Sequence, residues 1–139
     1  MTSKNAVDNF LTCKSIAVAG VSRNKRKFGY IVYAHLKENN YKVYPINPNV
    51  KEINSEKCYP NLAEIKEKID GVILVVPPTQ SVKVVREANE LGIKNIWFQQ
   101  VSSSEEAVKF CEGNNISFVR DECILMFAEP VKSIHKFHR

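Results

Sequence analysis

Residues 15–29 of the chain, SIAVAGVSRNKRKFG, decide how the rest of the sequence is interpreted. A short apolar run is followed by a glycine, a serine and four basic residues, and then by the start of an amphipathic stretch. A buried strand that leads through such a loop into a helix is typical of α/β proteins whose helix N-terminus faces an anion. The segment therefore predicts a strand, an anion-binding loop and a helix.

The chemistry of this loop suits a phosphate group. Gly20 allows the backbone to approach an anion closely, Ser22 offers a hydroxyl donor, and the helix start presents free amides. The surrounding cations are Arg23, Lys25, Arg26 and Lys27. The loop is not a Walker A motif, because no GK[ST] follows the glycine, and it is not GxGxxG, because a serine replaces the second glycine. A solvated basic turn is the alternative interpretation.

Outward from this loop, short β-branched runs alternate with amphipathic stretches. The expected strands are residues 15–19, 42–46, 71–76, 95–99 and 117–119. Helical spacing over residues 28–38 and 82–91 predicts helices that cover the sheet; in the first, the apolar residues are Phe28, Ile31, Val32 and Leu36. This order predicts an α/β fold, a three-layer, doubly wound, mainly parallel five-stranded sheet. Ligands of such sheets bind beyond the carboxyl ends of the strands.

Local signals mark several helix ends. Asn61 with Glu64 and Ser103 with Glu106 have capping-box spacing. Glycines at positions 92 and 113 stand where a left-handed residue is expected after a helix. The chain of 139 residues is predicted to form one domain, residues 1–139, in which residues 128–139 are a C-terminal tail or helix.

The loops after the later strands carry the other candidate site residues. Asn47 and Pro48 follow the second strand, where a NAD-binding domain usually has an acid that holds the ribose diol. An amide there suits a nucleotide without a free diol, although Asn-Pro is also an ordinary turn former. Pro77 and Pro78 after the third strand form a rigid apolar wall, and Trp97 near the end of the fourth strand is expected in the core.

Composition and charge exclude several classes of protein. Hydrophobic residues make up 44% and charged residues 25%, so the chain is globular rather than disordered. No apolar run approaches the ~20 residues of a membrane span, and no export signal is present, so we expect a cytoplasmic protein that does not bind a membrane. Four cysteines without a CxxC pair favour reduced thiols and no metal site.

The excess of basic over acidic residues lies mostly in residues 23–27. The net charge is +5 and the isoelectric point is near 9.0, which raises the alternative of a nucleic-acid binder. Residues 23–27 hold four of the 20 basic residues and no acid, which leaves +1 (16 basic against 15 acidic) for the rest. A compact polyphosphate ligand explains this distribution better than a nucleic acid, so we expect no nucleic-acid partner.

Six segments, in one order along the chain, resemble a known family. They are IAVAGVSRNKRKFGY (16–30), VYPINPN (43–49), KCYPNLAEI (57–65), ILVVPP (73–78), IWFQQVSSSEEA (96–107) and ECILMF (122–127). Together, over about residues 10–127, they look like the small single-domain coenzyme A-binding proteins, relatives of the N-terminal CoA-binding domain of succinyl-CoA synthetase α subunits. The resemblance implies a Rossmann-like fold in which CoA or an acyl-CoA lies across the carboxyl ends of the strands.

The same resemblance implies roles for individual residues. Gly20, Val21, Ser22 and Lys27 would contact the phosphates, and Asn47 and Pro48 would lie near the nucleoside. Val76, Pro77 and Pro78 would wall the cleft, and Gln99 would lie near its floor. Arg23 and Phe28 of the same basic loop are further candidate binding residues. This chain departs from the family at Gln100-Val101-Ser102, where a proline-glycine turn is usual, so contacts near the pantetheine arm are expected to differ. The synthetase carries its phosphohistidine in another domain, so ligase chemistry by this chain alone is not implied.

No catalytic constellation is found in the sequence, and an enzyme is the less favoured hypothesis. We expect a non-catalytic carrier, sensor or partner module, acting as a homodimer or with an enzyme partner. The alternative is an NAD(P)-dependent oxidoreductase on the same scaffold, against which the missing acid after the second strand argues. Cys123 is expected to be a buried, inert thiol, but a mixed disulfide between it and CoA is a subsidiary hypothesis.

Overall fold

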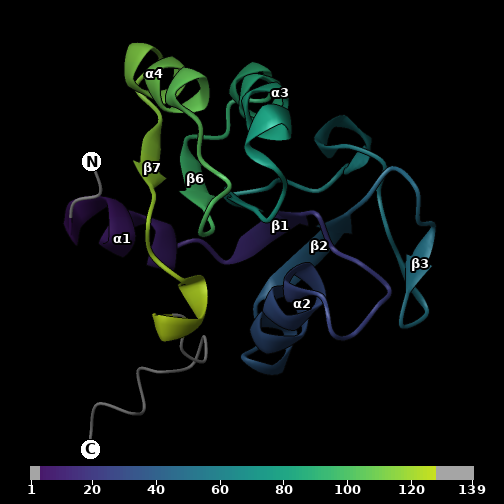
Figure 1. Ribbon diagram of the computed structural model, residues 1–139. Helices are drawn as coiled ribbons and strands as arrows, with labels where there is room; N and C mark the ends of the chain where they lie inside the picture. Colours follow the sequence, from purple (N-terminus) through teal and green to yellow (C-terminus); the bar gives the residue numbers. More distant parts are fainter. Residues whose placement is uncertain (1–3, 128–139) are drawn as a thin grey trace, which may run out of the picture.

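Five parallel strands form the central sheet of the computed structural model, which describes residues 4–127. The strands are β1 (Ser15–Ala19), β2 (Lys42–Ile46), β5 (Gly71–Leu74), β6 (Asn95–Phe98) and β7 (Ser117–Val119), in the spatial order β2-β1-β5-β6-β7 (Figure 1). The predicted strands at 71–76 and 95–99 are slightly too long. Ladder hydrogen bonds nevertheless continue beyond both observed ends, from Val75 N to Ala19 O and from Gln99 N to Leu74 O.

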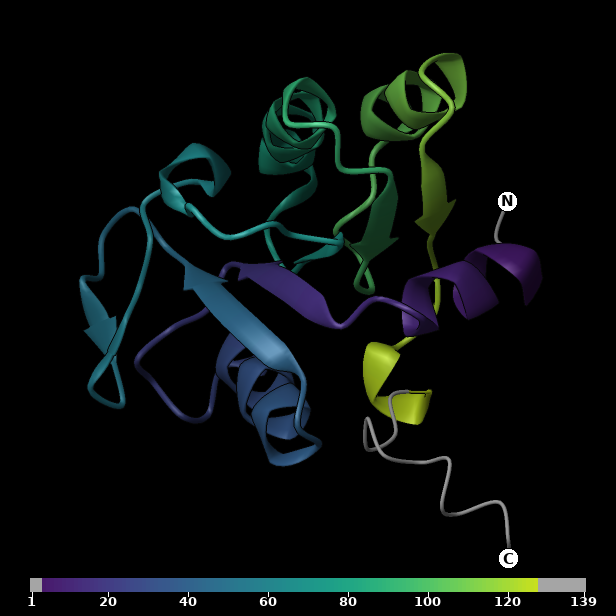
Figure 2. The same ribbon diagram turned by 180° about the vertical axis from the view of Figure 1, so that it is seen from behind.

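Helices cover both faces of the sheet, which confirms the predicted three-layer, doubly wound architecture (Figures 1 and 2). One face carries α1 (Lys4–Leu11), α2 (Phe28–Glu38) and the short 3₁₀ helix η2 (Ile124–Met126). The other carries η1 (Leu62–Glu64), α3 (Pro78–Glu90) and α4 (Glu105–Gly113). The α1 helix was not predicted. The chain leaves β1 toward β2 and then returns to place β5 on the opposite side of β1, so the strand order reverses between β1 and β5.

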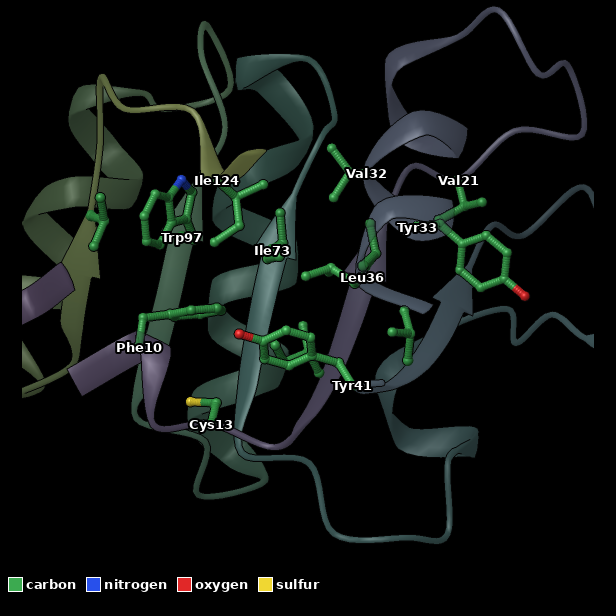
Figure 3. Packing of buried hydrophobic residues seen from close by; sticks show 14 of the residues in the cluster. Phe10, Cys13, Val21, Val32, Tyr33, Leu36, Tyr41, Ile73, Trp97 and Ile124 are labelled. Atoms are coloured by element: carbon green, nitrogen blue, oxygen red, sulfur yellow. The ribbon is translucent and has the colours of Figure 1, made fainter. Parts of the chain in front are cut away.

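Trp97 lies at the centre of one core, as expected from its position near a strand end. Its side chain is fully buried, its ring meets that of Phe10 edge-to-face at 5.4 Å between centroids, and its Nε1 donates to the carbonyl of Glu122 at 3.1 Å. Figure 3 shows the same cluster joining α1, the sheet and α2. Burial of a large ring with its one polar atom satisfied stabilises this layer without an unpaired donor.

The buried face of α2 differs from the predicted one. Phe28 and Ile31 are 37% and 39% exposed, whereas the buried positions are Gly29, Val32, Tyr33 and Leu36. These four positions follow the i, i+3, i+4, i+7 spacing of a single helix face. Val32 and Leu36 are buried as predicted. The prediction was wrong for Phe28 and Ile31, because it favoured large apolar residues and gave Gly29 no packing role.

Two of the predicted helix ends are also corrected. The N-cap of α4 is Ser104, whose Oγ accepts from Ala107 N at 3.1 Å, and not Ser103. Gly113 is the last residue of α4, and Asn115 takes the left-handed conformation instead, with φ +57°. The Asn61 cap of η1 and the left-handed Gly92 after α3 are confirmed.

A two-stranded hairpin after β2 was not predicted. It consists of β3 (Glu52–Ile53) and β4 (Glu56–Lys57), and its two turn residues, Asn54 and Ser55, both have positive φ. Paired positive φ values are typical of the type I′ turn, whose twist matches that of the flanking strands. Among residues 4–127, no helix is long and apolar enough to cross a membrane, and no cluster of metal-ligating side chains is found.

The cap of α4 gives a test of this fold. Replacing Ser104 with Ala removes the acceptor for Ala107 N, and we expect a loss of about 1 kcal/mol in the free energy of unfolding. Thermal unfolding followed by circular dichroism should show Tm lowered by about 4 °C. The neighbouring Ser103→Ala is the control and should leave Tm unchanged; an equal loss in both variants would contradict the assignment.

Candidate functional site

Two glycines bring the ends of the basic loop, residues 20–28, together. A Cβ atom on Gly29 would lie 2.1 Å from the carbonyl oxygen of Gly20, which no side chain can tolerate. Gly20 itself has φ +98°, and a Cβ there would lie 2.1 Å from the carbonyl oxygen of Val75. The start of α2, the end of β1 and the chain after β5 therefore meet backbone to backbone at the strand reversal.

Within the loop, side chains organise the backbone by short-range hydrogen bonds. Ser22 Oγ accepts from Asn24 N, and Asn24 Oδ1 accepts from Arg26 N, each at 2.9 Å. Lys27 is the N-cap of α2, and a lysine side chain has no acceptor, so no side chain caps the first-turn amides. All four cations of the loop are exposed, and no ion pair involves them within residues 4–127.

Asn47 joins the loop after β2 to the loop after β1. Its Nδ2 donates to the carbonyl of Val21 at 2.8 Å, and its Oδ1 accepts from Asn49 N at 2.8 Å. The carbonyl of Ile46 also accepts from Gly20 N at 3.0 Å. The polar atoms of the Asn47 side chain are thus used to hold the two loops in register.

These loops open onto a cleft of about 880 Å³, called here the main cleft. Five of the predicted residues, from three separate loops, line it: Gly20, Asn47, Pro48, Val76 and Pro77. Sequence reasoning missed its other lining residues, among them Pro60, Asn61, Leu62, Lys83, Arg86 and Glu87. Lys83 and Arg86 are three positions apart on α3, and this spacing after the double proline was a usable signal that both would share one helix face.

Glu87 closes one side of the main cleft by capping η1. Its two carboxylate oxygens accept from Leu62 N at 3.2 Å and from Ala63 N at 3.1 Å. The carboxylate therefore binds the first amides of η1 and ties that segment to α3.

Seven predicted residues do not line the main cleft. Val21 and Gln99 are buried, and Ser22, Lys27, Phe28 and Pro78 lie on the loop or at the helix starts beside it; Arg23 lines a neighbouring hollow. Gln99 is 1% exposed, and its Oε1 accepts from Ile124 N at 2.9 Å. Its Nε2 is buried with no hydrogen-bond partner among the described residues.

The neighbouring hollow, called here the side hollow, has a volume of about 750 Å³. It is lined by Arg23, Asn49 and residues 50–55 of the hairpin region, which include Lys51. Asn49 lines both cavities, so the side hollow adjoins the main cleft. Its charged lining residues are Arg23, Lys51 and Glu52, so cations outnumber carboxylates there by one.

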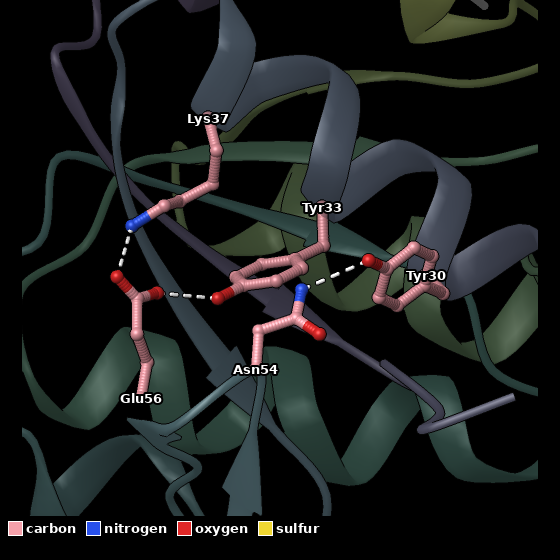
Figure 4. A network of polar contacts seen from close by, with 5 residues as sticks. All are labelled: Tyr30, Tyr33, Lys37, Asn54 and Glu56. Carbon is pink, nitrogen blue, oxygen red and sulfur yellow. Dashed lines mark hydrogen bonds and ion pairs between the residues drawn. The ribbon is translucent and has the colours of Figure 1, made fainter. Parts of the chain in front are cut away.

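A polar network fixes the hairpin against α2 (Figure 4). Glu56 accepts hydrogen bonds from Tyr33 Oη and from Lys37 Nζ, the latter at 2.5 Å, and Tyr30 Oη accepts from Asn54 Nδ2 at 2.8 Å. The bonds from Lys37 and Tyr33 hold the pKa of Glu56 below its ordinary value, while burial and the Glu56 carboxylate raise the pKa of Tyr33. The network thereby fixes the position of the hairpin residues that line the side hollow.

The thiols of the described residues differ in exposure. Cys13, Cys58 and Cys111 are buried, and burial raises the pKa of Cys13 and Cys111 to about 12. Cys123 at the start of η2 is only partly buried, so the expectation of a fully buried thiol there was wrong. It follows β7 on a segment joined to β6 by the bond from Ile124 to Gln99.

Comparisons with known proteins match the chain to one family and to solved structures. The family described as "CoA binding domain" matches residues 14–129. Acetate–CoA ligase [ADP-forming] II of Archaeoglobus fulgidus is 38% identical over 101 residues, which are 71% of this chain and 15% of the ligase. The chain spans only 12–20% of the acetate–CoA ligases it matches.

Proteins of similar size also match. The uncharacterized protein YneT of Bacillus subtilis is 29% identical over 111 residues, covering 80% of this chain and 82% of YneT. A hypothetical protein from Pyrococcus horikoshii OT3 has a solved structure that superposes with a TM-score of 0.82 at 32% identity, covering 89% of this chain and 88% of that one. The Rossmann-like fold is therefore shared with a solved structure.

The Glu56 network predicts a pH dependence of stability. Because the folded state lowers the pKa of Glu56, its contribution is complete above the ordinary value of 4.5 and is lost as pH falls through the lower folded pKa. Tm of the wild type should exceed that of Glu56→Gln at pH 6–7, and the difference should shrink below about pH 4.5. Glu52→Gln, on the same hairpin, is the control; a Tm difference that stays constant down to pH 3 would refute the role of the Glu56 charge.

Proposed function

The chain belongs to the CoA-binding domain family, and from this premise we propose that it binds coenzyme A or an acyl-CoA in the main cleft, as a module without catalysis of its own. The observation that carries the proposal is the convergence of Gly20, Asn47 and Val76, from three separate strand-end loops, on one cleft of about 880 Å³. A cleft of this size at the strand reversal of a doubly wound sheet is where such folds bind nucleotides.

The charges around the cleft support a polyanionic ligand. CoA carries a pyrophosphate and a 3′-phosphate, and the N-terminus of α2 with the exposed basic loop offers backbone donors and positive charge for them. Lys83 adds a cation from α3, and Arg23 with Lys51 adds two in the adjoining side hollow. The ligand would thus meet cations on both sides of the cleft.

The loop after β2 supports a nucleotide that lacks a free ribose diol. Asn47 uses its amide to hold the neighbouring loops, and Pro48 and Pro60 present apolar surface to the cleft. An acid at position 47 would repel a 3′-phosphate, whereas NAD recognition usually relies on such an acid. The geometry therefore favours CoA over NAD.

Gln99 does not support a direct contact with the ligand in this conformation, because its side chain is 1% exposed and does not line the main cleft.

Acyl activation would be carried out by another protein. The acetate–CoA ligases that match are five or more times longer than the matched region, so this chain corresponds to a binding part of such enzymes. We place it as a carrier, sensor or partner module that presents CoA to an enzyme partner or acts as a homodimer.

Ligand-induced thermal stabilisation tests the proposal. Millimolar CoA should raise the Tm of the wild type, and Arg23→Ala combined with Lys27→Ala should reduce this shift, because two cations near the phosphates are lost. Lys66→Ala combined with Lys109→Ala removes the same charge elsewhere and should leave the shift intact.

Two outcomes would contradict the proposal. No change in Tm at millimolar CoA would refute CoA binding, and a larger shift with NADPH than with CoA would favour the oxidoreductase instead. Salt-sensitive binding to DNA that survives neutralisation of residues 23–27 would indicate a nucleic-acid site elsewhere.

Thiol exchange with CoA is a separate expectation. The Cys123 thiolate would attack the disulfide of oxidised CoA, forming a protein–CoA disulfide and releasing one CoA thiolate. Because Cys123 is partly exposed and the other three cysteines are buried, intact-mass and peptide mapping should locate a single CoA adduct on Cys123. Cys123→Ser is the control. Equal labelling of Cys13, or the absence of an adduct, would refute thiol exchange at Cys123.

A further inference from the structure

Three residues of the described part of the chain have buried polar side chains, aromatic and cysteine residues aside. They meet at one junction, Gln99 through its backbone carbonyl. They are Ser81 (0% exposed), Gln99 (1%) and Ser102 (2%). A buried polar group is unfavourable unless it is hydrogen-bonded, so its partners show what it holds. The junction lies where the turn after β6 meets the start of α3.

Ser102 is the centre of this junction. Its Oγ accepts from Val76 N at 3.1 Å, its carbonyl accepts a short hydrogen bond from Ser81 Oγ, and its own amide donates to Gln99 O at 2.8 Å. One residue thereby connects the end of β6, the first turn of α3 and the chain after β5.

Ser102 Oγ accepts a hydrogen bond from Val76 N, which the sheet leaves without an acceptor. Val75 N continues the sheet by donating to Ala19 O, but Pro77 and Pro78 have no amide hydrogen. Val76 N is therefore the last donor before α3. Its acceptor comes from a side chain 26 positions away and not from the sheet.

Val76 is also the part of the wall that faces the basic loop. It lines the main cleft, and a Cβ atom on Gly20 would lie only 3.1 Å from Val76 Cγ1. The position of Val76 therefore determines how closely the wall approaches the loop after β1. Ser102 bonds to the amide of Val76 and does not itself line the cleft.

The turn that presents Ser102 is held in an unfavourable conformation. Val101 has φ +57° and is 86% exposed, although β-branched residues rarely adopt positive φ. Its side chain gains little from burial, so the conformation is imposed by the bonds that fix Ser102.

We propose that Ser102, held by Ser81, is a positioning residue that sets the geometry of the main cleft and hence its affinity for the ligand. The inference rests on the proposed function, because the ligand used to measure affinity is CoA. Neither serine lines the cleft, so both act through Val76.

The test is calorimetric titration with CoA at a temperature where circular dichroism shows each variant folded. Ser102→Ala should weaken CoA affinity about three- to tenfold, the equivalent of one lost hydrogen bond. Ser81→Ala should also weaken CoA affinity, and this variant tests the inference if Ser102→Ala does not fold. Ser102→Thr keeps the hydroxyl and should restore affinity, while the matched control Ser103→Ala should bind as the wild type does.

The outcomes separate this inference from the proposed function. A purely structural role would lower Tm in Ser102→Ala and Ser81→Ala but leave their dissociation constants at the wild-type value, and that result would overturn the inference. Failure of the wild type to bind CoA would instead refute the proposed function itself.

Discussion

The structure depends on the contact between Gly20 and Gly29. The backbone at the end of β1 touches the backbone at the start of α2, with no space for a side chain on Gly29, and Gly20 in turn touches the chain after β5. Any Cβ at either position would collide with a carbonyl oxygen and push the three segments apart. The main cleft and the N-terminus of α2 have their positions because these segments stay in contact.

Polar groups around the cleft are mostly used to hold the protein together. Asn47 joins two strand-end loops, Glu87 caps η1, and Ser102 holds Val76. The charged side chains of the basic loop are instead exposed and without ion pairs in the described residues. The scaffold is thus rigid where it shapes the cleft, and positive charge is left available where a phosphate would bind.

The fold could be predicted from the sequence to a large extent. Three of the five strands and the helix at residues 28–38 were predicted at their observed bounds, because each is a local apolar pattern between clear turn signals. The hairpin at residues 52–57 was missed because strands of two residues have no periodicity. The α4 cap was misplaced by one residue, since Ser103 and Ser104 are chemically identical candidates and only the helix geometry distinguishes them.

The sequence by itself determined the sheet, the strand-end loops and the concentration of charge at residues 23–27, because these follow from the order and chemistry of neighbouring residues. The tertiary structure decided which side chains share the cleft. The bonds from Asn47 to Val21 and from Val76 to Ser102 each join residues 26 positions apart, and Lys83 and Arg86 reach the cleft only because α3 packs beside β5. Such pairings depend on how strands and helices pack, which local sequence patterns do not encode.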